Sequence, residues 1–135
     1  MSELEIYIDG ASKGNPGPSA IGVVILRDGK PVKNLCRFIG EATNNIAEYS
    51  ALIVALEEGL ALGASCLSIK TDSELLYRQI KKIYKVRNAG IMALYEKAVR
   101  LIAAYSRVSI NHVPRELNKE ADRMANLAIK QQRIS

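Results

Sequence analysis

The chain has 135 residues, enough for one domain with a sizeable core, and 48% of them are hydrophobic, an ordinary share for a globular protein. No apolar run is long enough to span a bilayer, and the N-terminus shows no signal-peptide pattern. Cys36 and Cys66 lie far apart and match no metal-binding or redox motif. We therefore expect a single domain over residues 1–135, reduced cysteines and a cytoplasmic location.

The net charge of +5 is unevenly distributed along the chain. Residues 1–72 carry six Lys+Arg and nine Asp+Glu, a net of −3, whereas residues 73–135 carry thirteen and five, a net of +8. A basic surface around an acidic spot suits a polyanion held by its backbone while metal ions occupy the acidic spot. A solvated surface of mixed charge is the alternative.

In chain order, the first segment alternates apolar and polar residues from Leu4 to Asp9, which predicts a strand that ends in a carboxylate. Glycines and Pro16 in the next eight residues predict a tight turn. The β-branched run 20–26 predicts a second strand, Asp28-Gly29 a hairpin turn, and 31–39 a third strand. Three strands with short links form an antiparallel meander.

The next segment, 46–62, is rich in Ala, Leu and Glu and predicts a helix. We expect Thr43 or Asn44 to cap it, Gly63 to end it, and Glu48 to lie in its first turn. Residues 65–71 predict a strand followed directly by Asp72. A helix between two strands implies a parallel crossover, so this strand should lie beside the first.

The remaining segments continue the alternation of helices and strands. Ser73 is expected to cap a helix over 74–83, and a basic link leads to a helix over 91–105. A last strand over 107–113 and a loop at 114–116 precede a final helix. Asn118 is its expected cap, and Asp122 lies about one turn inside it.

Four carboxylates can converge in this arrangement: Asp9 and Asp72 at neighbouring strand ends, with Glu48 and Asp122 near helix starts. Carboxylates placed so close together repel unless divalent ions neutralise them. Oxygen ligands without cysteine favour Mg²⁺ or Mn²⁺ over Zn²⁺, and a pair of such ions suits phosphodiester cleavage. Taken singly, each acid has a structural or solvated alternative, such as a favourable interaction with a helix dipole.

Four motifs in order resemble type 1 ribonuclease H, specifically its compact branch. They are Asp9-Gly10-Ala11 with Gly14-Asn15-Pro16-Gly17, Thr43-Asn44-Asn45-Ile46-Ala47-Glu48, Thr71-Asp72-Ser73, and Asn118-Lys119-Glu120-Ala121-Asp122. The resemblance covers nearly the whole chain. It implies an α/β, ribonuclease H-like fold: a five-stranded mixed sheet in the order 3-2-1-4-5 with helices on both faces.

The resemblance also implies an activity, hydrolysis of the RNA strand of RNA–DNA hybrids that leaves 5′-phosphate and 3′-hydroxyl ends. Asp9 would bridge two Mg²⁺ ions, for which Mn²⁺ can substitute; Glu48 and Asp72 would complete one metal site and Asp122 the other. The implied substrate-binding residues are Ser12, Asn15, Thr43, Asn44, Asn45, Asn88 and Asn118. Thr43 and Asn88 would hold a phosphate of the DNA strand, and turn or cap chemistry is the alternative for the asparagines.

Better-known bacterial members carry a basic, tryptophan-rich protrusion that this chain lacks, since it has no Trp and passes almost directly between its helices. Substrate binding should then depend on nearby basic residues or on help in trans. The basic residues are Arg78, Lys81, Lys82, Lys85 and Arg87.

The single histidine, His112, precedes Asp122 by ten residues, the separation of a catalytic loop histidine in relatives. We place His112 inside the last strand as a structural residue. Arg115 then becomes our candidate for the product side of the reaction, with Glu116 and His112 itself as the alternatives for this role.

Three rival interpretations remain: an integrase-like strand-transfer domain, a non-catalytic hybrid-binding module, and a fragment of a larger polyprotein. The Asn44-Asn45 motif argues against the first, and the intact acid set argues against the second. The chain begins with Met1, from which we expect a free-standing, monomeric enzyme with no membrane association and no obligate protein partner.

Overall fold

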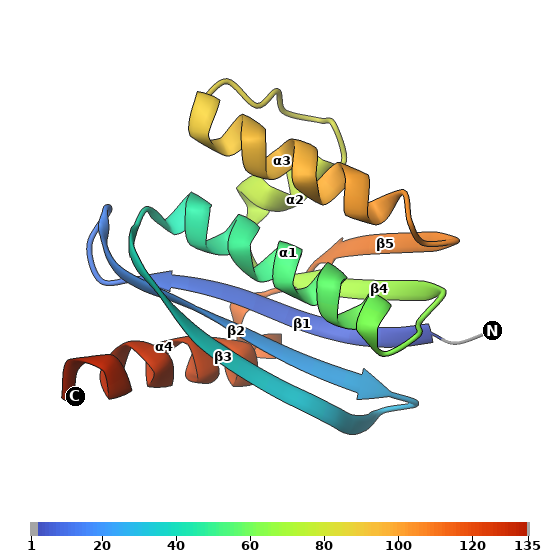
Figure 1. Ribbon diagram of the computed structural model, residues 1–135, viewed down its shortest axis with the longest axis horizontal. Helices are drawn as coiled ribbons and strands as arrows, with labels where there is room; N and C mark the ends of the chain where they lie inside the picture. Colours follow the sequence, from blue (N-terminus) through green and yellow to red (C-terminus); the bar gives the residue numbers. More distant parts are fainter. Residues whose placement is uncertain (1–2, 135) are drawn as a thin grey trace.

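Five strands form one mixed sheet in the order β3-β2-β1-β4-β5 (Figure 1). The computed structural model describes residues 3–134. Strand β1 is antiparallel to β2, as β2 is to β3, whereas β4 is parallel to both β1 and β5. The order and directions predicted from the sequence are thus confirmed. The strands are β1 (Glu3–Ser12), β2 (Gly17–Arg27), β3 (Lys30–Ala42), β4 (Cys66–Thr71) and β5 (Arg107–His112).

Helices lie on both faces of this sheet, and Figure 1 shows α1, α2 and α3 on one side and α4 on the other. Helix α1 packs on β1 and β2, α3 packs on α1, and α4 packs on β2, β3 and β1. The helices are α1 (Asn44–Ala61), α2 (Glu74–Ile80), α3 (Ala89–Ile102), the 3₁₀ turn η1 (Arg115–Leu117) and α4 (Lys119–Ile134). None of the described helices has the length and apolar character needed to cross a membrane.

The main core lies between α1 and the sheet, where alternate strand residues point toward the helix. The alternating residues of β1 are fully buried, and so are their neighbours on the flanking strands and on α1. These residues are Leu4, Ile6, Ile8, Ile21, Val23, Ile25, Leu52, Leu56, Leu67 and Ile69. The period of two seen in the sequence therefore fixes which residues of β1 face outward from this core, including Asp9.

Helix α1 begins two residues earlier than predicted, because Thr43 is its N-cap. The Thr43 hydroxyl accepts a hydrogen bond from the Ile46 amide at 3.2 Å, which leaves Asn44 and Asn45 inside the helix. Glu48 consequently lies in the second turn, so the prediction that it occupies the first turn was wrong. At the other end Gly63 has a φ of 78°, as expected of a residue that ends a helix.

Other boundaries shifted where the chain turns. Helix α2 ends at Ile80 rather than at residue 83, because the chain reverses through Lys82, which has a φ of 64°. Asn88 caps α3, so this helix begins at Ala89, two residues earlier than expected. It ends at Ile102 and not at residue 105. The expected loop at 114–116 is replaced by η1.

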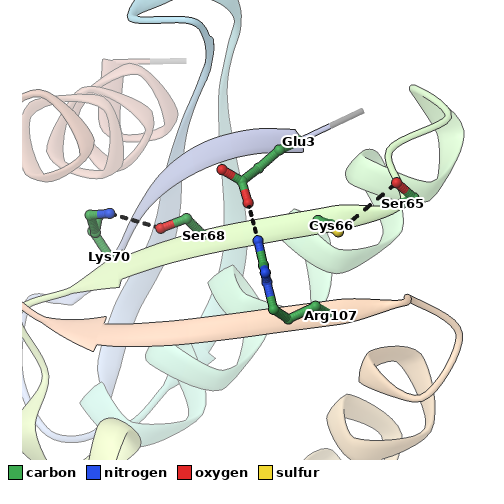
Figure 2. Close-up of polar contacts among 6 residues, drawn as sticks. All are labelled: Glu3, Ser65, Cys66, Ser68, Lys70 and Arg107. Carbon is green, nitrogen blue, oxygen red and sulfur yellow. Dashed lines mark hydrogen bonds and ion pairs between the residues drawn. The ribbon is translucent and has the colours of Figure 1, made fainter. Parts of the chain in front are cut away.

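Helix α4 packs mainly on β1, β2 and β3, and polar side chains cover β4 and β5 on the same face. Figure 2 shows Glu3 of β1 extending across β4 toward Arg107 of β5, where the two side chains form an ion pair of 2.8 Å. Lys70 of β4 pairs with Glu5 at 3.2 Å and bonds Ser68 at 2.8 Å. These pairs cover the part of the sheet that α4 leaves uncovered.

Candidate active site

A cavity of about 670 Å³ opens at the carboxyl ends of β1 and β4, between the starts of α1 and α4. Most of the residues expected from the sequence to form a site line it. These residues are Asp9, Ser12, Asn15, Thr43, Asn44, Asn45, Glu48, Asp72, Arg115 and Asp122. The parallel pairing of β1 and β4 explains the location, because it brings two strand ends to one edge of the sheet.

Three of the four carboxylates lie within ligand distance of a shared point. Asp9, Glu48 and Asp72 each offer an oxygen, and these three oxygens lie within 4.8 Å of one another. Asp122 lies outside this group of three but lines the same cavity, and its carboxyl group helps to raise the pKa of Asp9. Four elements, β1, α1, the end of β4 and α4, therefore deliver one acid each.

Gly10 makes the close approach of α1 to β1 possible. A Cβ at this position would lie 2.3 Å from the backbone carbonyl carbon of Ala47 and 2.4 Å from the amide nitrogen of Glu48. Without a side chain in the way, the Gly10 amide donates a hydrogen bond to Glu48 Oε1 at 2.5 Å. The glycine that follows Asp9 thus fixes the position of the second acid relative to the first.

The surroundings of the acids raise the pKa of two of them strongly. Asp9 is 5% exposed, and burial, reinforced by repulsion from Glu48, Asp72 and Asp122, raises its pKa from 3.8 to about 9. Burial likewise raises the pKa of Glu48 to about 8, although the Gly10 amide and Arg115 act in the opposite direction. Without a cation, this cluster holds protons that a solvated carboxylate would release.

This donor set fits a divalent cation. The lining acids offer hard oxygen ligands, and no cysteine or histidine lines the described cavity. A cation among these oxygens would replace the retained protons and remove the repulsion among the acids. The chemistry of the site therefore indicates divalent metal dependence.

The two expected residues that do not line the cavity, Asn88 and Asn118, have other contacts. Asn88 Oδ1 accepts hydrogen bonds from the amides of Gly90 and Ile91, which is the cap chemistry left open as an alternative. Asn118 is 1% exposed, and its Nδ2 bonds Asp72 instead of facing the cavity. Asn118 directly precedes α4, and its carbonyl oxygen accepts a hydrogen bond from the Asp122 amide at 3.2 Å, as expected of the residue that caps this helix, although its side-chain Oδ1 has no hydrogen-bond partner.

The polar rim of the cavity is linked to the glycine turn after β1. Asn15 Oδ1 accepts a hydrogen bond from the Asn44 amide at 3.1 Å, which ties the turn to the start of α1. Ser12 donates to the carbonyl oxygens of Gly14 and, at 2.9 Å, of Ala42. Asn45 Oδ1 is buried without a hydrogen-bond partner.

Of His112 and Arg115, only Arg115 lines the cavity. His112 is the last residue of β5, as predicted; it lies outside the cavity lining, with Nε2 3.3 Å from the Asp72 carbonyl oxygen and its ring 5.9 Å from that of Tyr77. Arg115, in η1, lines the cavity close enough to Glu48 to lower its pKa.

Sequence reasoning missed Asn126, which lines the cavity from α4. Its Nδ2 donates to the Asp122 carboxylate at 3.1 Å and to the Asp122 carbonyl oxygen at 2.9 Å. The spacing of four residues from Asp122 on a helix could have revealed it, since such residues share one face.

Comparison with known proteins agrees with this architecture. A family model described as "Reverse transcriptase-like" matches residues 7–128. The chain is 40% identical over 127 residues to a ribonuclease HI of Halobacterium salinarum, covering 93% of this chain and 64% of that protein. It therefore spans less than two thirds of that relative's length, and 35% of the length of mycobacterial relatives that are 39% identical to it.

Two further matches cover nearly the whole of both partners. A ribonuclease H of Erythrobacter litoralis is 36% identical over 143 residues, covering 95% of this chain and 96% of the relative. The crystal structure of LC11-RNase H1 in complex with an RNA/DNA hybrid matches with a TM-score of 0.91 and 37% identity, over 96% of this chain and 98% of that one. Since full-length relatives match along with the fold and the cavity, this chain belongs to the ribonuclease H family.

Proposed function

We propose that this chain is an endonuclease that hydrolyses the RNA strand of RNA–DNA hybrids, leaving 5′-phosphate and 3′-hydroxyl ends. The observation that carries the proposal is the meeting of Asp9, Glu48 and Asp72 within 4.8 Å, in a cavity that Asp122 also lines. The hybrid bound to the related LC11-RNase H1 supports the choice of substrate.

The cofactor of this proposal is Mg²⁺, two ions per site, with Mn²⁺ able to substitute. Asp9 would contribute to both ion sites, with Glu48 and Asp72 at one and Asp122 at the other. Bound there, the ions supply Lewis acidity to the nucleophilic water and to the leaving 3′ oxygen. The carboxylates would hold these ions, and the buried position of Asp9 would limit the access of solvent to them.

Recognition of RNA would depend on the polar rim of the cavity. Ser12, Asn15, Asn44 and Asn45 present hydroxyl and amide groups that can bond the ribose 2′-hydroxyl, the group that distinguishes RNA from DNA. Thr43 also lines the cavity, and we propose that it contacts a phosphate of the DNA strand together with Asn88 at the start of α3.

Several general properties complete the proposal. Residues 1–135 would act as a single, monomeric domain in the cytoplasm, without a membrane or an obligate protein partner. The free thiols of Cys36 and Cys66 support a reducing compartment.

A cleavage assay tests the function. A hybrid labelled on either strand is incubated with protein and Mg²⁺, and we expect cleavage of the RNA strand only, abolished by EDTA and by Asp9→Asn. If the protein binds the hybrid but does not cleave it in Mg²⁺ or Mn²⁺, the proposed nuclease activity is contradicted and a non-catalytic binding module is favoured.

The same assay tests the proposed role of Arg115 on the product side. Arg115→Ala should lower kcat by roughly a hundredfold, the loss typical when one group that stabilises developing charge is removed, whereas His112→Ala should leave kcat close to the wild-type value because His112 lies outside the cavity lining. The reverse ranking would transfer the role to His112.

A further inference from the structure

Three carboxylates around the cavity share a feature: each accepts a hydrogen bond from a neutral N–H group. Glu48 is bonded by the Gly10 amide, Asp72 by the side chain of Asn118, and Asp122 by the side chain of Asn126. A neutral donor orients a carboxylate without cancelling its charge, whereas a lysine or arginine would compete with a cation for it. This pattern suits acids that must stay available to a metal.

Asn118 connects three elements that carry acids. Its Nδ2 donates to the carbonyl oxygen of Ile8, directly before Asp9, at 2.8 Å and to Asp72 Oδ2 at 3.3 Å. Asn118 itself directly precedes α4, which carries Asp122. One buried amide therefore fixes the relative positions of β1 next to Asp9, the end of β4 and the start of α4.

The orientation of the Asn118 amide follows from its two acceptors. Turning the group over would place its oxygen against a carbonyl oxygen and a carboxylate. In the observed orientation, however, Asn118 Oδ1 is buried and has no hydrogen-bond partner. An unpaired buried oxygen lowers the stability of the folded state, so this orientation of the amide is kept at the expense of stability, as occurs at functional sites.

Asn126 forms hydrogen bonds with the fourth acid, Asp122, which lies only four residues earlier in the sequence. It lies one helical turn after Asp122, and its Nδ2 bonds both the carboxylate and the main-chain carbonyl of that residue. The two bonds restrict rotation of the Asp122 side chain and occupy Oδ1, which leaves Oδ2 as the oxygen without this donor.

We propose that Asn118 and Asn126 are positioning residues that set the affinity of the site for divalent cations by orienting Asp72 and Asp122. The proposal rests on the cation site of the proposed function, but it concerns metal binding and not cleavage. Removing a residue that orients a metal ligand typically lowers metal affinity about tenfold to a hundredfold. We expect the loss of either amide to fall in this range.

The experiment measures Mn²⁺ binding to the full chain without nucleic acid, by isothermal titration calorimetry and by electron paramagnetic resonance. We expect Asn126→Ala to weaken Mn²⁺ binding about tenfold and to broaden or shift the Mn²⁺ spectrum, with little change in Tm. Asn118→Ala should weaken binding at least as much and also lower Tm, because Asn118 is buried.

Two matched controls separate positioning from stability. Gln79 is 7% exposed and accepts a hydrogen bond from the Tyr49 hydroxyl at 2.8 Å outside the cavity, so Gln79→Ala should lower Tm without changing Mn²⁺ affinity. Ser50 bonds the Ile46 carbonyl one turn earlier in α1, and Ser50→Ala repeats the loss of a local helix contact, again without changing affinity.

The outcomes distinguish this proposal from the function itself. Mn²⁺ affinity and spectra within about twofold of wild type in both asparagine variants, with Tm lowered as in Gln79→Ala, would overturn it. Wild-type protein that binds Mn²⁺ but leaves the hybrid intact would overturn the nuclease and leave the positioning role standing if the variants bind more weakly. Wild-type protein that binds no Mn²⁺ would overturn both.

Discussion

Burial and the neighbouring negative charges both raise the pKa of Asp9. The residue is nearly enclosed, the other three acids repel it, and its pKa rises to about 9. Glu48 shares this position with a pKa of about 8. In the metal-free protein both groups therefore hold protons at neutral pH, and the folded state gives up stability to keep them together.

The first prediction concerns how the stability of the metal-free protein depends on pH. Between pH about 4 and about 9 the folded state binds more protons than the unfolded chain, so its free energy of unfolding falls as pH rises through this window. In EDTA we expect Tm to fall by roughly 5 °C or more between about pH 5 and about pH 8, and Mg²⁺ to reduce the fall.

Asp9→Asn serves as the matched variant for this measurement, because it removes the charge and keeps the shape. Its metal-free Tm should change less with pH than that of wild type, as followed by circular dichroism. A wild-type Tm that stays constant or rises across the same window would contradict the pKa shifts.

How much of the site could be predicted differs from residue to residue. Asp9 follows Ile8 in β1, Asp72 follows Thr71 of β4, and Ile8 and Thr71 are paired, so alternation and parallel pairing predict that the two acids meet at one edge. Asn118 was expected to face the substrate, yet tertiary packing buries it against Ile8 and Asp72, residues 110 and 46 positions away. Contacts across such separations leave no local pattern in one sequence, whereas the short spacing of Asn126 from Asp122 does.

Among the elements, α4 lies very close to the sheet at Gly22 of β2. A Cβ on this residue would lie 2.0 Å from the carbonyl oxygen of Ala121 and 2.8 Å from the amide of Ala125. The small, buried side chains of Ala121, Ala125 and Ala128 on α4 complete the close packing. Because Asp122 follows Ala121 directly, the position of one acid depends on this contact.

The second prediction is that Gly22→Ala displaces α4. The added methyl group meets helix backbone, so we expect a loss of about 1–3 kcal/mol in the free energy of unfolding, or more, together with weaker Mg²⁺ binding through Asp122. Urea unfolding and metal titration measure the two effects.

Gly90→Ala is the control for this substitution. Gly90 lies in the first turn of α3, where a Cβ would lie 3.2 Å from Asn88 Oδ1, the far end of a side chain. Alanine favours the helix by up to about 1 kcal/mol, so stability should be kept. Equal stability of Gly22→Ala and wild type would show that α4 adjusts freely, contrary to the packing described.

Element types were predictable because each has its own period, but boundaries were set by individual side chains. Thr43 caps α1 and so moves Glu48 into the second turn, and the left-handed turn at Lys82 ends α2 early. Two adjacent cap candidates, such as Thr43 and Asn44, cannot be ranked without the turn that orients them. Here Asn15 fixes that turn by bonding the Asn44 amide.

Over the whole molecule, positive charge gathers in the segment that links α2 and α3. Lys81, Lys82, Lys85 and Arg87 are exposed there. Arg78 on α2 pairs with Glu74 at 3.3 Å and lies 5.4 Å from the ring of Tyr84, which holds this residue against the segment. In Figure 1 this link and the hairpin between β2 and β3 lie on opposite sides of the molecule.

The third prediction is that these lysines bind the hybrid backbone. Replacing Lys81, Lys82 and Lys85 by alanine should weaken hybrid binding and reduce the slope of log affinity against log salt by up to about 3, roughly one for each lost phosphate contact. Fluorescence anisotropy in the Asp9→Asn background measures binding without cleavage.

The hairpin supplies a charge-matched control, since replacing Arg27, Lys30 and Lys33 by alanine removes the same charge at a distance from the cavity. Only a small change in affinity is expected there. Equal losses from the two triple variants would mean that net charge alone attracts the hybrid, and the link between α2 and α3 would lose its specific role.

The placement of Asp122 on α4 has a consequence during synthesis on the ribosome. Translation delivers Asp9, Glu48 and Asp72 well before Asp122, Asn118 and Asn126, which lie on or just before α4. A nascent polypeptide that has not yet released this helix from the exit tunnel has neither the fourth acid nor the amide that holds Asp72. The emerging chain therefore brings its four carboxylates together only once α4 docks on the sheet.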